Sequence, residues 1–378
     1  MSSKFPSKLT LLLEKRKAEN NFRKLSLSSK KLIDFSSNDY LGFSKNPELK
    51  KRKEKILKQY QSKQEGSTGA RLISGNSLLA ENTEKQIAKF HNGEAALLFN
   101  SGYDANTGLL SSVPQKRDLV LYDELCHSSI IDGVRQSFAD SFKFRHNDVE
   151  HLQRLLERNS HAETLFVVTE SVFSMDGDCA LLKEISILCK RHNAFLIVDE
   201  AHATGVYGST GKGLCNETGI EKDCFARVYT FGKALGTHGA AVVGGTELKD
   251  YLVNFARSFI YTTALPPSSI ATVSAAYGLL KDKKSKVSLE KNIKLFNSLT
   301  AKFPAKISST SAIHCFLIPG NENAIRAAEN LQKKGFDVKP IKSPTVRAGS
   351  ERLRICLHAT NTTDEIKKLA IELKNIFC

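Results

Sequence analysis

The sequence has no long apolar run. Near its start, the segment MSSKFPSKLTLLLEKRKAEN holds no apolar stretch of signal-peptide length, and no later segment approaches the length that spans a membrane. The eight cysteines stand singly, with no CxxC pair and no dense framework, which favours reduced thiols over disulfides. From these absences we expect a cytoplasmic protein with no membrane partner and no metal site.

Acidic residues are in the minority. The chain has 40 Asp and Glu against 55 Lys and Arg, a formal net charge of +15. Such an excess fits nucleic acid, an anionic membrane, or acidic small molecules and carrier proteins. No zinc-finger, RNP or basic-zipper pattern accompanies the charge, and the basic run at 50–58 is typical of a solvated helix face. We therefore expect no nucleic-acid partner, with a basic nucleic-acid-binding protein as the alternative from another class.

A Walker A motif is also missing. The glycine-rich stretch GSTGARLISGN (66–76) lacks the Gly-Lys-Ser/Thr ending of a nucleotide-binding loop. The box Asp199-Glu200-Ala201-His202 is spelled like that of helicases, but helicases need a Walker A as well. These absences exclude a P-loop nucleotide hydrolase, and the glycines of 66–76 predict tight turns.

Short apolar runs alternate with helical stretches along the chain. The predicted strands are Ala95–Phe99, Leu119–Tyr122, Thr164–Thr169, Phe195–Val198, Val228–Thr230 and Ala240–Val243. Amphipathic segments such as His151–Glu157 and Leu181–His192 lie between them. This alternation predicts an α/β fold with a mostly parallel sheet flanked by helices.

The tail of the chain has a different pattern. A helix-like, Lys-rich segment at Ala271–Lys286 leads into predicted strands at Ile313–Ile318 and Leu353–Leu357 and predicted helices at Asn323–Lys334 and Thr363–Phe377. We predict three parts: an N-terminal helix and arm (1–40), a large α/β domain (41–275) and a smaller α+β C-terminal domain (276–378).

Reactive side chains follow several of the predicted strands. Asp199 and His202 follow the strand at 195–198, Lys233 follows that at 228–230, and His127 follows that at 119–122. The segment 100–106 follows the strand at 95–99 and opens a helix. In an open α/β sheet, ligands bind where parallel strands end. Each residue alone has a bland alternative, since Asp after a strand often caps a turn and a lone His is often a satisfied polar residue.

Together these residues fit one chemistry. A lysine amine can form a Schiff base with a carbonyl cofactor, and an acidic partner keeps a pyridine nitrogen protonated so that the ring draws electrons from a carbanion. A Ser-Gly turn that enters a helix offers N–H groups to a phosphate, and an imidazole can cover the face of the ring. The set predicts a pyridoxal phosphate (PLP) site.

The motifs that contain these residues resemble those of the α-oxoamine synthases, PLP-dependent enzymes of fold type I. The resemblance runs from about Arg23 to about His358. It rests on FSSNDYLGFS (35–44), GSTGARLISGN (66–76), ALLFNSGYDAN (96–106), HNDVEHLQRLL (146–156), VTESVFSMDGD (168–178), VDEAHATGVYG (198–208), TFGKALGTHGAAV (230–242), FARSFIYTTALPP (255–267) and SPTVRAGSERLR (343–354).

The resemblance implies roles for individual residues. Lys233 would carry PLP and move the substrate proton, Asp199 would pair with the pyridine nitrogen, and His127 would stack on the ring. The other implied cofactor contacts are His202 and Ser174 near the phenolic oxygen, Gly102, Tyr103 and Thr230 at the phosphate, and Thr262 or Thr263 at the phosphate of a neighbouring subunit. The resemblance thereby implies a homodimer with shared sites.

The resemblance also implies the substrates. Among the family, the chain is most similar to members of biotin biosynthesis, which condense L-alanine with pimeloyl-CoA or a pimeloyl acyl-carrier protein to give 8-amino-7-oxononanoate, CO2 and the free thiol. Asn38 and Arg354 would hold the amino-acid carboxylate, and Arg23 and Thr345 would lie along the acyl chain. A sister synthase that uses glycine and acetyl-CoA is the alternative within the family. The members of biotin biosynthesis commonly have Pro at the end of the loop before the last Arg-Leu-Arg, where this chain has Arg347.

Overall fold

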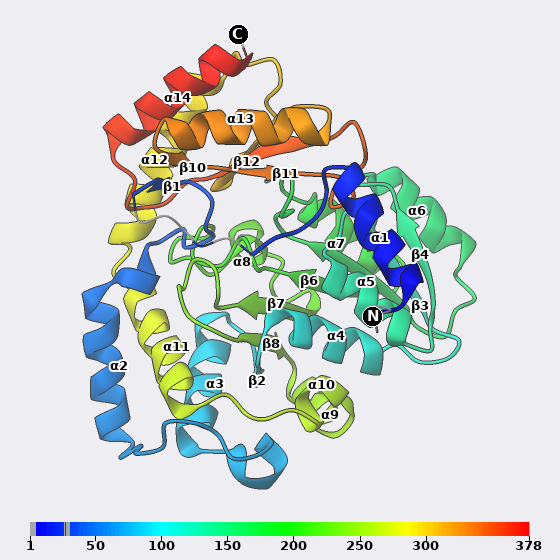
Figure 1. Cartoon of the computed structure of the whole chain (residues 1–378). Coiled ribbons are helices and arrows are strands. Elements are labelled where there is room, and N and C mark those ends of the chain that lie inside the picture. Colours follow the sequence, from blue (N-terminus) through cyan, green and yellow to red (C-terminus); the bar gives the residue numbers. More distant parts are fainter. Residues whose placement is uncertain (1–4, 26, 28–30, 378) are drawn as a thin grey trace.

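The computed structural model describes residues 5–25, 27 and 31–377. Its largest element is a seven-stranded sheet with the strand order β2-β8-β7-β6-β5-β3-β4 (Figure 1). The strands are β2 (Ala95–Phe99), β3 (Leu119–Asp123), β4 (Asp140–Phe144), β5 (Leu165–Glu170), β6 (Phe195–Asp199), β7 (Cys224–Thr230) and β8 (Ala240–Gly244). The strand β8 runs antiparallel to both of its neighbours, and the other pairs in the sheet are parallel. The predicted mostly parallel sheet is therefore confirmed.

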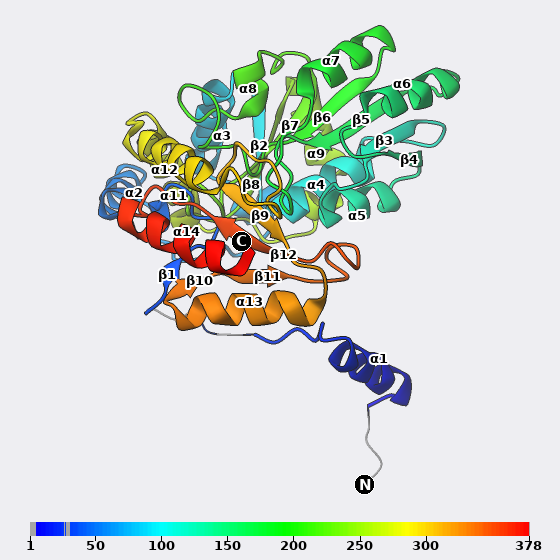
Figure 2. The ribbon, with the colours of Figure 1, turned by 90° about the horizontal axis from the view of Figure 1, so that it is seen from above.

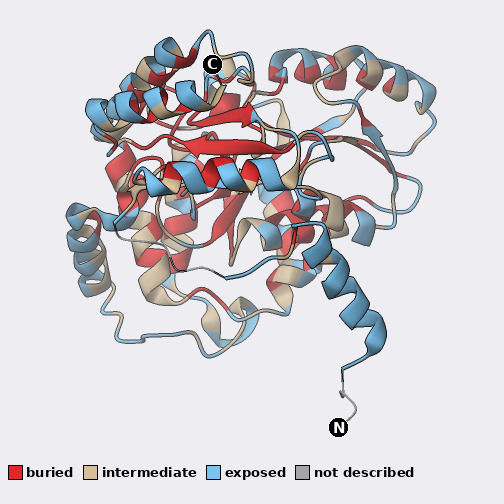
Figure 3. Cartoon of the chain, turned by 45° about the horizontal axis from the view of Figure 1, so that its top comes forward, coloured by how far each residue is buried: buried red, intermediate tan, exposed pale blue. Residues whose placement is uncertain are grey.

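The strands of this sheet are apolar on both faces because helices cover both. Successive residues of β5 alternate between two core clusters, with Val167 in one and Phe166 and Val168 in the other. The same alternation holds in β6, where Val198 and Ile197 belong to different clusters. A strand buried on both faces reads as a continuous apolar run, which is why the central strands were predictable from the sequence. Figure 3 shows that buried residues, in red, gather on the strands and on the inner sides of the helices.

Two helical layers supply the covering. The core cluster on one face draws buried residues from α4 (Gly102–Ser112), α5 (Ser128–Gln136), α9 (Thr246–Phe255) and α10 (Arg257–Ile260). The core cluster on the other face draws them from α2 (Pro47–Gln59), α3 (Leu78–Phe90), α6 (Val149–Arg158), α7 (Leu182–Arg191), α8 (Leu214–Thr218) and α11 (Pro267–Leu280). Short 3-10 and π turns, η1 (Phe43–Lys45) and η2 (Arg71–Gly75), flank α2 and α3. No described helix combines the length and apolar character that a membrane crossing demands.

The C-terminal part holds a second, antiparallel sheet of order β11-β12-β9. Its elements are α12 (Lys284–Thr300), β9 (Ile313–Leu317), α13 (Asn321–Lys333), β10 (Phe336–Asp337), β11 (Lys339–Ile341), β12 (Arg352–Cys356) and α14 (Thr363–Phe377). The short strand β1 (Ile33–Asp34) pairs in parallel with β10, so the N-terminal segment joins this part of the molecule. The division of the chain at residues 40 and 275 stays a prediction.

The N-terminal helix α1 (Ser7–Ala18) buries none of its residues and stands apart from the rest of the molecule (Figure 2). The chain that follows it is held by the C-terminal part: Asn321 Nδ2 donates to the carbonyl of Glu19 at 2.9 Å, and Lys342 Nζ donates to that of Asn20 at 2.8 Å. These contacts place Arg23, three residues after Asn20, beside the loop that follows β11.

One sequence prediction needs correction, and one strand was not predicted. The segment Ala271–Lys286 is not one helix, because α11 ends at Leu280 and α12 begins at Lys284. Between them Lys283 has a left-handed backbone with φ of 56°, which an α-helix cannot contain. The sequence also gave no sign of β4, since four of its five residues are exposed and an edge strand of this kind lacks the buried apolar pattern.

One buried residue of the C-terminal sheet conflicts with its surroundings. His314 on β9 has no exposed surface, and neither ring nitrogen has a hydrogen-bond partner among the described residues. Its ring packs against that of Phe296, with centroids 4.9 Å apart. Burial, helped by the charge of Lys306, lowers the pKa of His314 to about 3. A buried donor and a buried acceptor without partners each cost stability.

We predict that His314→Leu stabilises the protein by about 1–3 kcal/mol, because it removes both unpaired nitrogens and keeps an apolar side chain of similar size. The effect should also depend on pH. His314 titrates near 6.5 when unfolded and near 3 when folded, so the wild-type stability is complete above about pH 6.5 and is lost as the pH falls toward 3. Leucine takes no proton, so the variant should lose less stability than wild type between pH 7 and 5, measured as the thermal midpoint.

The matched control is His161→Leu, since His161 is exposed. It should leave the midpoint and its pH dependence near those of wild type. A lower midpoint for His314→Leu at pH 7 would contradict this reading of His314.

Candidate active site

The predicted strand-end residues His127, Asp199 and Lys233 meet in one cavity of about 260 Å³, and His202 contacts Lys233 beside it. It lies at the carboxyl ends of β6 and β7, beside the turn from β2 into α4. Its lining residues are Asn38, Ser101, Gly102, Tyr103, Asn106, His127, Ser129, Glu170, Asp199, Ala201, Thr230, Gly232, Lys233, His238 and Gly239. The strands β6 and β7 are neighbours in the sheet, which explains how Asp199 and Lys233 come together from 34 positions apart.

Lys233 lies on a tight turn between β7 and β8. The turn is closed by a hydrogen bond from the N–H of Gly236 to the carbonyl of Lys233 at 2.8 Å. Gly236 has φ of 59°, and a Cβ there would lie 2.2 Å from the backbone nitrogen of Ser44, so only glycine fits. The Lys233 Nζ lies 2.8 Å from Nε2 of His202. Burial lowers the pKa of Lys233 to about 8, although the carboxyls of Asp199 and Glu170 oppose the shift.

Asp199 is buried and both of its carboxylate oxygens are engaged. Oδ2 accepts a hydrogen bond from Asn106 Nδ2 at 2.7 Å, and Oδ1 accepts from the backbone N–H of Ala201 at 2.8 Å. Asn106 Nδ2 also lies 3.0 Å from Ser129 Oγ. The helices α4 and α5 and the segment after β6 therefore together fix the direction in which this carboxylate faces the cavity.

Glu170 places a second carboxyl in the same cavity. It accepts a hydrogen bond from the N–H of His127 at 2.6 Å. Burial, together with the charge of Asp199, raises its pKa to about 8. Two buried carboxyls in one cavity do not both ionise easily, which favours the protonated form of Glu170 near neutral pH.

The two histidines of the site are both neutral at pH 7. Burial lowers the pKa of His127, whose Nδ1 lies 2.7 Å from Ser129 Oγ. Burial and the charge of Lys233 hold the pKa of His202 well below its ordinary value. A neutral imidazole carries one proton, so each ring offers one donor and one acceptor.

The other end of the cavity is suited to an anion. Here α4 begins, capped by Ser101, whose side chain accepts from the N–H of Asp104 at 3.1 Å. A Cβ at Gly102 would lie 2.4 Å from Thr230 Cγ2, so glycine keeps the space between them open. The hydroxyl of Thr230 is buried and has no hydrogen-bond partner among the described residues. A helix N-terminus and a free hydroxyl together are what a phosphate binds.

Arg354 on β12 lies just behind this cavity. Its Nη2 donates to Oδ1 of Asn38 at 3.0 Å, and its Nε donates to the carbonyl of Ser174 at 2.7 Å. The expected group of Asn38 and Arg354 is thus brought together. Ser174 reaches Arg354 through its backbone and does not line the cavity with Lys233.

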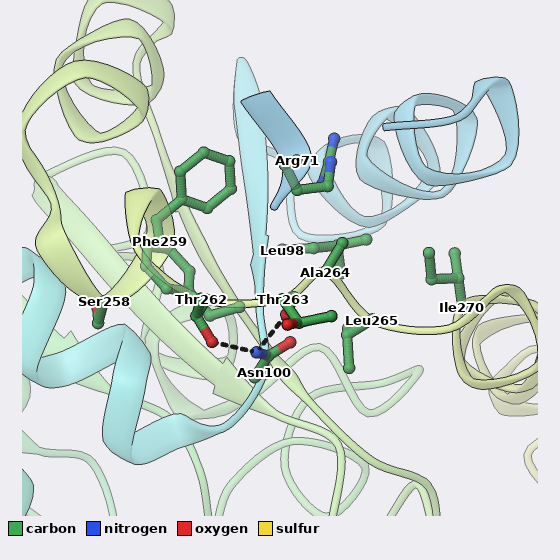
Figure 4. Close-up of a pocket in the computed structure, with 11 residues that line it drawn as sticks. Arg71, Leu98, Asn100, Ser258, Phe259, Thr262, Thr263, Ala264, Leu265 and Ile270 are labelled. Carbon is green, nitrogen blue, oxygen red and sulfur yellow. Dashed lines mark hydrogen bonds between the residues drawn. The ribbon is translucent and has the colours of Figure 1, made fainter. Parts of the chain in front are cut away.

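Thr262 and Thr263 line a separate pocket (Figure 4). Asn100 Nδ2 donates to the hydroxyl of Thr262 at 3.0 Å and to the carbonyl of Thr263 at 2.8 Å. Within one chain, neither threonine lines the cavity that contains Lys233. Their expected role at a neighbouring subunit stays a prediction.

Arg23 and Thr345, far apart in the sequence, come together at the surface. The Arg23 Nη2 lies 3.4 Å from the hydroxyl of Thr345, a long hydrogen bond. Arg347 of the same loop instead forms an ion pair with Glu124, with a separation of 2.9 Å. Of Arg23 and Arg347, Arg347 already has an acidic partner.

Three residues of the site did not stand out in the sequence. Asn106 and Glu170 lie within the motifs 96–106 and 168–178, where only their neighbours carried a recognisable chemical role. Tyr40, in the motif with Asn38, has its hydroxyl 2.7 Å from Nδ1 of His202. Their positions in the motifs are the only sequence signal, since an amide, a second acid and a tyrosine have many structural uses.

Comparison with known proteins supports the geometry. Residues 30–373 match the family described as "Aminotransferase class I and II". The chain is 42% identical over 369 residues to 8-amino-7-oxononanoate synthase of Emericella nidulans. The alignment covers 92% of this chain and 90% of that protein. The crystal structure of the Francisella tularensis 8-amino-7-oxononanoate synthase is 30% identical, with a TM-score of 0.78, over 93% of this chain and all of that one.

A serine palmitoyltransferase from S. paucimobilis, solved with a bound PLP–myriocin aldimine, has 27% identity and a TM-score of 0.90 over 98% of this chain and 97% of that one. The sequence match and both structural likenesses extend over nearly the whole chain, and they confirm the resemblance to the α-oxoamine synthases. The chain therefore belongs to the class I and II aminotransferase family of enzymes and, within it, to the branch whose curated relatives are named 8-amino-7-oxononanoate synthase.

Proposed function

We propose that this protein is the PLP-dependent acyltransferase that condenses L-alanine with a pimeloyl thioester in biotin biosynthesis, in the cytoplasm. The products are 8-amino-7-oxononanoate, CO2 and the free thiol. One observation carries the proposal: a half-buried lysine amine, a fixed carboxylate and a threonine hydroxyl with no partner among the described residues share one cavity beside a helix N-terminus. The names of the curated relatives support the pathway.

The residues present fit PLP. Its phosphate would bind at the start of α4, where the Thr230 hydroxyl has no partner among the described residues and Gly102 leaves space for an anion. Lys233 would hold its carbonyl carbon, and Asp199 would face the ring nitrogen. His127, and Tyr103 on the first turn of α4, line the remaining walls. The cavity thus offers a cationic amine, an anion and a phosphate cradle, matched to the three ends of this cofactor.

When bound, PLP supplies an electron sink that stabilises negative charge at the substrate carbon. The protein's residues do the rest. Asp199 would keep a proton on the ring nitrogen, since Asn106 and the backbone N–H of Ala201 hold its carboxylate in place. Lys233, with its pKa lowered to about 8, can give and take a proton near neutral pH. His202 can exchange a proton with this amine, since its Nε2 lies 2.8 Å from Nζ of Lys233.

Asn38 and Arg354 are the proposed carboxylate site for L-alanine. The guanidinium of Arg354 is fixed by Ser174 and by Asn38, so its planar face is oriented before the substrate arrives. A charge-assisted hydrogen bond to a carboxylate is among the stronger contacts a protein can make. This pair would set the direction of the amino acid relative to Lys233.

Arg23 and Thr345 are the proposed contacts of the acyl chain. A pimeloyl group is a methylene chain that ends in a carboxylate, so its far end needs a cation. Arg347 is already paired with Glu124, whereas Arg23 contacts the neutral hydroxyl of Thr345. The geometry therefore favours Arg23 as the partner of the distal carboxylate. The net charge of +15 would also draw an anionic CoA or an acidic carrier protein to the surface.

We further propose that two copies share their sites. Large exposed apolar side chains adjoin residues of the Figure 4 pocket in the sequence: Leu72 and Ile73 follow Arg71, and Tyr261 precedes Thr262. Such a patch beside a site is typical of an interface. Thr262 and Thr263 would then face the phosphate bound by the other copy.

The first prediction from this proposal concerns Lys233. Purified protein should be yellow, and borohydride should attach the cofactor permanently to Lys233, identified by peptide mass spectrometry. Lys233→Ala should bind PLP more weakly and lose turnover, because the residue that holds the cofactor and moves the proton is gone. The control is Lys249→Ala, whose amine is paired with Glu84 outside the cavity. Attachment to any other lysine would contradict the assignment.

The second concerns the acyl chain. Arg23→Ala should raise the apparent KM for pimeloyl thioester by about ten- to a hundred-fold, the loss expected for one charge-assisted hydrogen bond. Alanine binding, followed by the visible spectrum of the cofactor, should stay unchanged because it depends on Asn38 and Arg354. Arg347→Ala is the matched control and should change the same KM far less. A larger effect from Arg347 than from Arg23 would reverse their proposed roles.

A further inference from the structure

A buried chain of hydrogen bonds joins the two cations of the active site. From Lys233 Nζ it passes to Nε2 of His202 at 2.8 Å, and from Nδ1 of the same ring to the Tyr40 hydroxyl at 2.7 Å. The Tyr40 oxygen lies 3.1 Å from Oδ1 of Asn38, which in turn lies 3.0 Å from Nη2 of Arg354. Tyr40 is completely buried, and His202 nearly so.

The chemistry of the two ends sets the direction of every hydrogen bond in this chain. An arginine side chain only donates, so the atom of Asn38 that faces Arg354 is its carbonyl oxygen. The Tyr40 hydroxyl is close to the same oxygen, which can only accept, so Tyr40 donates to Asn38. The hydroxyl oxygen of Tyr40 is then left to accept from Nδ1–H of His202.

The Lys233 end of the chain independently gives the same proton position on His202. Before it bears the cofactor, the amine of Lys233 is an ammonium below its pKa of about 8, and an ammonium has no lone pair. It must therefore donate to Nε2 of His202, so the single proton of the neutral ring lies on Nδ1. Had Tyr40 donated to His202 instead, its oxygen and that of Asn38 would face each other at 3.1 Å with no proton between them.

We propose that Tyr40 is a positioning residue that keeps a proton on Nδ1 of His202, so that Nε2 is the ring nitrogen that exchanges a proton beside Lys233. The inference rests on the proposed function only in taking Lys233 as the residue that bears the cofactor. Tyr40 contacts His202 and Asn38, whereas the proposed acyl contacts Arg23 and Thr345 lie at the surface, so the same proton position is expected whichever acyl thioester is used. Tyr40 also links the amino-acid carboxylate site to the proton-transfer site.

Other charged and titratable groups face this chain without displacing it. Burial raises the pKa of Tyr40, and the nearby Cys356 thiol reinforces the shift, so the hydroxyl keeps its proton. Arg354 is held on its other edge by Cys356, whose sulfur lies 2.9 Å from Nη1. Around Lys233 these groups are Asp199, Glu170 and Arg354. Around His202 they are Lys233, Arg354 and His127. Near Tyr40 the further group is Cys315.

The test reads the ring proton directly. In full-length protein with its cofactor and with ¹⁵N-labelled histidine, long-range ¹H–¹⁵N spectra distinguish a ring protonated on Nδ1 from one protonated on Nε2. The His202 signals are assigned by their loss in His202→Asn. We expect Nδ1 of His202 to carry a proton at pH 7. A wild-type ring protonated on Nε2 alone would overturn the proposal, and this result needs no variant to fold.

The variant Tyr40→Phe removes only the hydroxyl. We expect the Nδ1–H signal of His202 to be lost or to move to Nε2, and kcat to fall about ten-fold, as for one hydrogen bond, with little change in the KM for alanine. The matched control is Tyr277→Phe, because Tyr277 is also fully buried and its hydroxyl lies 2.9 Å from Nε2 of His91, away from Lys233. The control should leave the His202 signals and kcat unchanged. An unaltered His202 signal in Tyr40→Phe would overturn the proposal.

Discussion

The site depends on the parallel pairing of β6 with β7. This pairing brings the carboxylate of Asp199 to the same edge of the sheet as the turn that carries Lys233. Asp199 is buried and Lys233 is half-buried, and a charge in such a place is costly without a partner. Burial lowers the pKa of the Lys233 amine to about 8 against the opposing effect of the Asp199 and Glu170 carboxyls, which keeps the amine close to its titration point at neutral pH. The helical layers and the tight turn at Gly236 serve to hold this arrangement.

Around that pair, the cavity is shared by distant parts of the chain. The large sheet supplies Asp199, Thr230 and Lys233, while the C-terminal sheet supplies Arg354 and the N-terminal segment supplies Asn38. The strand β1, just before Asn38, pairs with β10 of the C-terminal part. A shift of the C-terminal part would therefore move both Asn38 and Arg354 relative to Lys233. This arrangement suits an enzyme in which the amino-acid substrate must be oriented before a proton is moved.

Much of the fold was predictable because the central strands are buried on both faces and read as apolar runs. The strand-end residues Asp199, His127 and Lys233 were predictable because parallel strands deliver their ends to one edge. The edge strand β4 was missed because its side chains are exposed, and the break at Lys283 was missed because a lysine gives no signal for a left-handed backbone. The roles of Tyr40 and Asn106 depend on contacts between elements far apart in sequence, which no local pattern encodes.

The choice of substrates is the central claim, and a product assay tests it most directly. Purified enzyme is given alanine, glycine or serine in every combination with pimeloyl, acetyl, succinyl and palmitoyl thioesters, and the products are identified by mass spectrometry. We predict that alanine with pimeloyl thioester gives the highest kcat/KM, with 8-amino-7-oxononanoate and CO2 in equal amounts. Preference for glycine with acetyl-CoA would contradict the proposed substrates and assign the same site to a sister reaction.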